Sequence, residues 1–127
     1  MELVALVILV AILEYMVFSG YVGWARGKYG ISAPAVSGNP EFERYYRVQM
    51  NTLEQLIVFI PAILVFSYFG NPTWGAAIGV LFIVGRPIYF VTYVKDPSKR
   101  TLGFMLGFLA NAVLVIGGLV AIVRSLI

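Results

Sequence analysis

The chain has 127 residues, of which 61% are hydrophobic and only 12% charged, and its mean hydropathy is +0.91. A soluble domain is about half apolar and about a quarter charged, so this composition indicates an integral membrane protein. The absence of cysteine and histidine excludes Cys/His metal sites, protein thiol nucleophiles and imidazole acid–base catalysis. We therefore expect no metal site, and any thiol chemistry would need a substrate that brings the sulfur.

Four stretches reach the length of about 20 mostly apolar residues that a membrane-spanning helix needs. They cover residues 3–25, 48–69, 74–94 and 102–125. The first contains Glu14, and its apolar run is longer than the apolar region of a signal peptide and lacks a basic segment before it. The third contains Arg86, and the fourth contains Asn111. The sequence predicts an all-α integral membrane protein, a four-helix bundle forming a single domain over residues 1–127.

The connections between the spans differ in charge. Residues 26–42 are rich in Gly and Pro and are predicted to form a loop, and residues 70–73 a tight turn. The first connection with its edge and the third connection, residues 95–100, carry most of the basic residues, which favours the cytoplasm for both. The short chain, without a retention tail, favours a bacterial inner membrane with the active site facing the cytoplasm.

Polar residues form a stripe on the second predicted helix. At about 100° per residue, the stripe is about 100° wide. It consists of Arg44, Arg47, Asn51, Glu54 and Gln55. One interpretation is structural, with an arginine and Glu54 neutralising each other inside the bundle. The other is a binding site for a small polar ligand with carboxylates and an amine, because arginine pairs with carboxylate and glutamate accepts from ammonium. We favour binding, because hydrogen bonds between helices in membranes stabilise by only about 0.6–2 kcal/mol each.

Two tyrosines extend this polar region. Tyr89 and Tyr93 are four residues apart and so share one face of the third predicted helix, and Arg100 follows at the start of the fourth. An aromatic belt at the membrane interface would explain one such tyrosine. Two tyrosines on one face beside an arginine favour a pocket shared with the stripe.

These residues resemble a known family signature. The run Phe-Glu-Arg-x-Tyr-Arg-x-Gln-x-Asn-x-x-Glu from Phe42 to Glu54 is similar to that of the MAPEG family, the membrane-associated proteins in eicosanoid and glutathione metabolism. The resemblance extends over nearly the whole chain and is strongest to the branch of microsomal glutathione transferase 2 and leukotriene C4 synthase.

The resemblance implies a homotrimer that binds glutathione as co-substrate between adjacent subunits. It assigns glutathione contacts to Arg26, Arg47, Gln49, Asn51, Glu54, Tyr89 and Tyr93, the two tyrosines coming from the neighbouring protomer. It makes Arg100 the catalytic residue, which stabilises the thiolate. The implied activity is a membrane-bound glutathione transferase acting on hydrophobic electrophiles, with possible peroxidase activity towards lipid hydroperoxides. The expected partners are further copies of the chain, membrane lipids and the electrophile, and no nucleic acid.

The sequence departs from the family signature at several positions, and alternative functions remain open. Gly27, Gln55 and Ile88 stand where leukotriene C4 synthase has two arginines and a tyrosine, which favours a more general transferase over leukotriene synthesis. The alternative is a non-catalytic lipid-binding or scaffold protein, like the 5-lipoxygenase-activating member of the family. A small transporter is less favoured. Many transporters have two interrupted helices at matching positions in the two halves of the chain, and the predicted spans show no such pair. Glu14 could pair with Arg47 or Arg86 or line the trimer axis.

Overall fold

The computed structural model describes residues 1–127 and consists of four long helices and one short turn of 3-10 helix. The elements in chain order are α1 (Glu2–Tyr29), α2 (Pro40–Phe69), α3 (Pro72–Lys95), η1 (Pro97–Lys99) and α4 (Thr101–Leu126). All four α-helices are long and apolar enough to cross a membrane. The four predicted spans are confirmed as helices.

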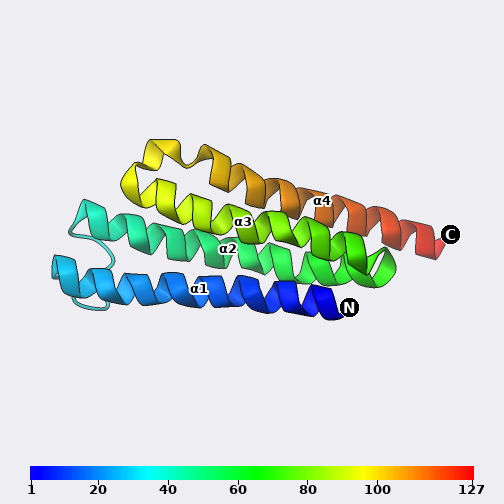
Figure 1. Cartoon of the computed structure of the whole chain (residues 1–127), viewed down its shortest axis with the longest axis horizontal. Helices are drawn as coiled ribbons and strands as arrows, with labels where there is room; N and C mark the ends of the chain where they lie inside the picture. The colour runs from blue at the N-terminus through cyan, green and yellow to red at the C-terminus, as the bar shows by residue number, and fades with distance from the viewer.

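The helices lie side by side and alternate in direction (Figure 1). α1 and α3 run one way, and α2 and α4 run the other. The loop between α1 and α2 and the η1 turn therefore lie at one end of the bundle, and both termini lie with the α2–α3 turn at the other (Figure 1). The two basic connections share one end, which we call the basic end, as the positive-inside argument requires.

The first connection is shorter than the sequence predicted. The predicted loop at residues 26–42 is wrong at both edges, because α1 continues to Tyr29 and α2 begins at Pro40. Gly30 ends α1 in the left-handed conformation, with a φ of 70°. Asn39 caps α2, since its Oδ1 accepts a hydrogen bond of 2.9 Å from the Phe42 amide. The polar stripe is therefore helical from its first residue.

α2 and α3 form the centre of the bundle, with α1 and α4 on either side (Figure 1). Phe59 of α2 and Phe82 of α3 are fully buried, and their rings stack with centroids 4.1 Å apart. α3 and α4 approach closely where Gly103 faces the backbone of Tyr89, because a Cβ on Gly103 would lie 2.3 Å from the Tyr89 nitrogen. Small residues at such crossings let helix backbones approach in membranes.

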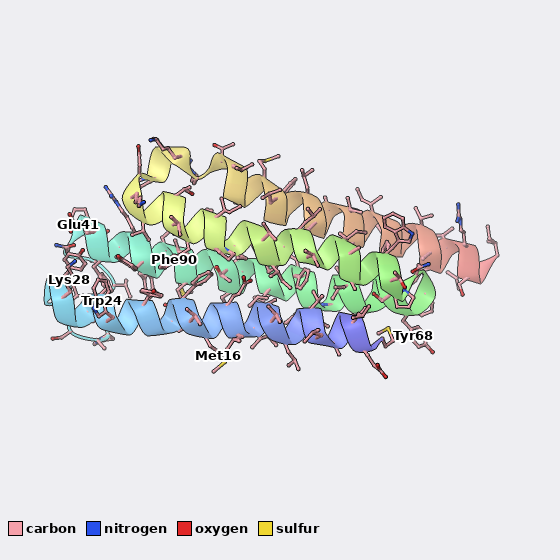
Figure 2. All side chains as sticks on the ribbon, in the orientation of Figure 1. Met16, Trp24, Lys28, Glu41, Tyr68 and Phe90 are labelled. Carbon is pink, nitrogen blue, oxygen red and sulfur yellow. The ribbon has the colours of Figure 1, made fainter.

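Much of the apolar surface points outward. Only 27 of 127 residues are buried, and leucines and valines on α1 and α4 are exposed, which suits contact with lipid or with other subunits. Figure 2 shows Met16 projecting away from the bundle on α1. It also places Trp24, Lys28 and Glu41 together at the basic end and Tyr68 at the opposite end.

Candidate active site

A polar cavity of about 640 Å³ lies among α2, α3 and the start of α4, towards the basic end. This volume is in the range of small-molecule binding sites. The lining residues are Arg47, Asn51, Tyr89, Tyr93, Arg100, Thr101 and Phe104. The structure thus brings five of the predicted site residues into one cavity.

The contribution of α2 follows from its helical period. Arg47 and Asn51 are four residues apart and so project on the same side of the helix. Asn51 is only 7% exposed, and its Oδ1 accepts a hydrogen bond of 2.7 Å from Arg86 Nη1. This bond fixes the amide, because the oxygen faces Arg86 and the NH₂ group remains for the cavity.

α3 supplies a pair of tyrosines. The Tyr89 and Tyr93 rings stack with centroids 5.3 Å apart, and Tyr89 is almost fully buried. The ring of Phe104 on α4 lies 6.4 Å from that of Tyr89. These rings form an aromatic wall opposite the arginines. The resemblance implied that the tyrosines meet Arg47 across a subunit boundary, whereas here they line the same cavity within one chain.

Arg100 enters the cavity from the connection between α3 and α4. The η1 turn places it there, and Arg100 Nη1 donates a hydrogen bond of 2.9 Å to the Pro97 carbonyl. Asp96 caps the turn, with Oδ1 accepting from the Ser98 amide at 3.0 Å and from the Ser98 hydroxyl at 2.7 Å. These two donors hold the pKa of Asp96 below its ordinary value. Arg100 itself is exposed, so its guanidinium is accessible to a ligand.

Glu54 lies beside the cavity and does not line it. Its Oε1 is 3.7 Å from Arg47 Nη2, and this is the only ion pair within 4.0 Å in the chain. The two side chains are 54% and 55% exposed, so the pair is open to approach by a ligand or another subunit. The structural interpretation, in which the pair is enclosed within the bundle, does not hold for a single chain.

Two predicted contacts lie away from the cavity in the single chain. Arg26 Nη1 donates to the Ala35 carbonyl at 2.7 Å, and its guanidinium lies over the Phe42 ring at 5.1 Å. It thereby ties the first loop to α2. Gln49 Nε2 donates to Ser19 Oγ at 3.0 Å and links α2 to α1. A glutathione contact for either residue remains a prediction.

Other members of the stripe hold the helices together. Arg44 Nη1 donates to the carbonyls of Val94 and Lys95, both at 3.2 Å, and so satisfies the end of α3. Asn111 Nδ2 donates to Gln55 Oε1 at 3.0 Å and connects α4 to α2. The sequence predicts one binding surface for the whole stripe, but the fold divides its residues between the cavity and contacts that join the helices.

Glu14 forms no ion pair within 4.0 Å in the single chain, so it makes direct contact with neither Arg47 nor Arg86. Arg86 does not line the cavity. It lies directly behind the cavity, fully buried and bonded to Asn51.

Sequence reasoning missed two cavity residues, Thr101 and Phe104. Both follow Arg100 at the start of α4, and Phe104 is one helical turn beyond it, which is the signal that could have identified them. Thr101 offers a hydroxyl and Phe104 an apolar face. With two guanidinium groups, an amide and two phenols, the cavity suits a ligand that carries anionic and polar groups.

Comparison with known proteins identifies the family of the chain. A model described as the MAPEG family matches residues 4–120. The chain belongs to the MAPEG family. Its curated relatives include an uncharacterised protein of Synechocystis sp., 43% identical over 122 residues that cover 96% of this chain and 89% of that protein. Human microsomal glutathione S-transferase 2 is 35% identical over 123 residues, which cover 97% of this chain and 84% of the human protein. Bovine leukotriene C4 synthase is 34% identical over 98 residues, covering 77% and 65% respectively.

Membership of the MAPEG family, together with four helices of spanning length, makes the chain an integral, multi-pass membrane protein. The matched region contains the whole cavity, from Arg47 to Phe104. Of the residues that carried the resemblance, Arg47, Asn51, Tyr89, Tyr93 and Arg100 line this cavity in the single chain, whereas Arg26, Gln49 and Glu54 do not.

Proposed function

We propose that this MAPEG protein is a membrane-bound glutathione transferase that conjugates glutathione to hydrophobic electrophiles. The observation that supports it most is the convergence of Arg47, Asn51, Tyr89, Tyr93 and Arg100 on one cavity. Glutathione has two carboxylates and one ammonium group, which suit arginines, an amide and the adjacent Glu54. Human microsomal glutathione S-transferase 2, by its name a glutathione transferase, is 35% identical.

Arg100 is the proposed catalytic residue. A cation beside a thiol lowers its pKa from about 8.5 and so raises the fraction of thiolate at neutral pH. The thiol proton leaves to solvent, and the thiolate attacks the electrophilic carbon. With a chlorinated nitrobenzene, a carbon–sulfur bond forms, the carbon–chlorine bond breaks and chloride leaves. With a lipid hydroperoxide, two glutathione molecules are oxidised to the disulfide while the hydroperoxide is reduced to an alcohol and water.

The proposed assembly is a homotrimer in a bacterial inner membrane, with the cavity facing the cytoplasm. The exposed Arg47–Glu54 pair supports an assembly, because charge that faces lipid within a span is costly and a neighbouring subunit would cover it. The number of subunits follows the resemblance. Arg26, Gln49 and Glu54 are proposed to contact glutathione in that assembly.

The direct test is conjugation of glutathione to a chlorinated nitrobenzene by the purified protein, compared with Arg100→Ala. We expect kcat to fall roughly 100-fold, as on removal of one preorganised charge-stabilising group. The ultraviolet absorbance of bound thiolate should fall at neutral pH, and the activity profile should move to higher pH because the thiol pKa returns towards about 8.5.

Lys99→Ala is the matched control, since Lys99 is also basic and exposed but does not line the cavity. It should retain wild-type kcat. Full activity and an unshifted thiolate absorbance in Arg100→Ala would reject Arg100 as the catalytic residue. Glutathione binding by the wild type without turnover would support the non-catalytic alternative, and absence of both would reject a glutathione site.

A further inference from the structure

Arg86 is the most deeply buried charge in the protein. Its relative exposure is 0%, although it lies in the middle of α3, within a membrane span. The guanidinium group stays protonated in proteins, so it cannot avoid the cost of burial by losing its charge. A charged side chain at this depth marks a function by default and needs a partner.

Arg86 contacts two walls of the cavity from behind. Its Nη1 donates to Asn51 Oδ1 at 2.7 Å, and its Cζ lies 4.7 Å from the centre of the Tyr89 ring. A weaker contact of 3.5 Å reaches Thr52 Oγ1. One flat guanidinium therefore holds an amide on α2 and a ring on α3, the two groups that face a ligand from different helices.

The charge of Arg86 is not neutralised by these contacts. Asn51, Thr52 and Tyr89 are neutral, and Arg86 Nε and Nη2 have no hydrogen-bond partner within the chain. On the α4 side Gly107 lies against the guanidinium, since a Cβ built there would be 3.3 Å from Arg86 Nη2, and it offers no side chain. The countercharge must therefore come from another element.

α1 provides a carboxylate near its middle, Glu14, and its Oε1 is the only buried carboxylate oxygen without a hydrogen-bond partner in the chain. Phe18 of α1 stacks on Phe90 of α3 with centroids 4.9 Å apart, which fixes the register of these two parallel helices (Figure 1). Glu14 lies one helical turn before Phe18, and Arg86 lies one turn before Phe90. The two charged residues are therefore level in the membrane and on facing sides of their helices.

The other carboxylate within the spans is already used. Glu54 is 3.7 Å from Arg47 and its side chain is 55% exposed, so it is not enclosed with the buried guanidinium of Arg86. The remaining acidic residues lie near helix ends or in connections. Glu14 is thus the only carboxylate that fits the buried face of Arg86.

We propose that Arg86, neutralised by Glu14 at the same depth, is a positioning residue that holds Asn51 and Tyr89 in place to bind the ligand of the cavity. The part that concerns glutathione rests on the proposed function. The compensation of the Arg86 charge by Glu14, without an ion pair within 4.0 Å, does not depend on it, because this part follows from burial and register.

The pairing is tested by a double-mutant cycle on thermal unfolding of the purified protein, with Glu14→Gln, Arg86→Met and the double variant. Each single change leaves one charge uncompensated in the membrane span, whereas the double change removes both. We expect the double variant to lose less stability than the two single losses added together. Additive losses would overturn the pairing.

The positioning role is tested by measuring kcat and KM for glutathione in the conjugation reaction of the folded variants. In Arg86→Lys we expect a KM for glutathione roughly tenfold higher, with kcat within about twofold, because an ammonium cannot both bond Asn51 and lie flat over Tyr89. Lys keeps the charge opposite Glu14, so its melting temperature should exceed that of Arg86→Met. A purely structural arginine would leave KM unchanged in the folded variant, which would overturn the positioning role.

Arg124→Lys is the matched control, an arginine in the last turn of α4 that is exposed and far from the cavity along the chain. Its KM and melting temperature should equal those of the wild type. If the wild type neither binds nor conjugates glutathione, the proposed function fails and with it the glutathione part of this inference. The unfolding cycle still decides the pairing of Glu14 with Arg86, so the two failures are distinguishable.

Discussion

At the scale of single residues, similar side chains have different roles because of where the helices place them. Arg44 satisfies carbonyls at the end of α3, Arg47 faces the cavity and Arg86 lies behind it. Asn51 faces the cavity, whereas Asn111 links two helices. Residue type alone did not distinguish binding from packing, because both uses need the same donors and acceptors.

Asp96 illustrates how one residue can set the position of another. Its carboxylate caps the turn that precedes Arg100, so Asp96→Ala should loosen the turn and lower kcat/KM for glutathione conjugation severalfold. Asp96→Asn keeps an acceptor for the Ser98 amide and should retain most of the activity. Equal activity in all three proteins would contradict a positioning role for the cap.

The same residue gives a pH dependence with a definite sign. Because the folded protein lowers the pKa of Asp96, its carboxylate stabilises the fold fully above the ordinary pKa and progressively less as pH falls through the lowered value. The gap in melting temperature between wild type and Asp96→Asn should be constant near neutral pH and should close as the pH falls below the ordinary aspartate pKa of 3.8. A gap that widens on acidification would show that the sign is wrong.

At the scale of elements, the close approach of α3 and α4 brings Arg100 and Phe104 to the tyrosines. A Cβ on Gly103 would lie 2.3 Å from the Tyr89 nitrogen, and backbone cannot move aside as a flexible side chain can. Gly103→Ala should therefore cost about 1–3 kcal/mol of unfolding free energy and raise KM for glutathione, because the wall of the cavity shifts.

Gly23→Ala is the matched control, because Gly23 is in the interior of α1 and a Cβ there meets nothing within 4 Å. Alanine in a helix is favoured over glycine by roughly 0.5–1 kcal/mol, so this variant should be neutral or slightly more stable. The comparison uses thermal unfolding in the same detergent. Similar losses in both variants would mean that the close approach at Gly103 is not tight.

The elements themselves were largely predictable. Apolar stretches of membrane length predicted all four helices. In lipid the backbone N–H and C=O groups have no water to bond with, and a single apolar segment satisfies them internally by forming an α-helix. The ends of the helices were less predictable. α2 begins at Pro40, where Asn39 caps it, whereas the sequence becomes apolar only near residue 48. Hydropathy therefore indicates which residues can lie in lipid, whereas the capping hydrogen bond of Asn39 sets the residue at which α2 begins.

At the scale of the whole molecule, both basic connections lie at one end of the bundle (Figure 1). We predict that this end faces the cytoplasm. The chain has no cysteine, so Ser98→Cys and Thr73→Cys each introduce a single label site at opposite ends. In intact cells a membrane-impermeant maleimide should label the position at residue 73 and not that at residue 98. The reverse pattern would contradict the proposed orientation.

The sequence predicted most of the residues of the candidate site but not the contacts between helices that bring them together. Arg47, Asn51, Tyr89, Tyr93 and Arg100 were identified from the sequence and converge on the cavity. Thr101, Phe104 and the hydrogen bond from Arg86 to Asn51 were not predicted. Their contacts join residues far apart in the chain, and helical spacing carries information only within one helix.

The sequence by itself determined the membrane class, the four helices, the family and the polar residues of the candidate site, because each depends on composition or on local spacing. Only the tertiary structure decided which of those groups meet. The register of α1 against α3 sets Glu14 level with Arg86, and the glycine crossing of α4 brings Arg100 to the tyrosines. Such registers come from side-chain packing between helices, which the period of a single helix does not encode.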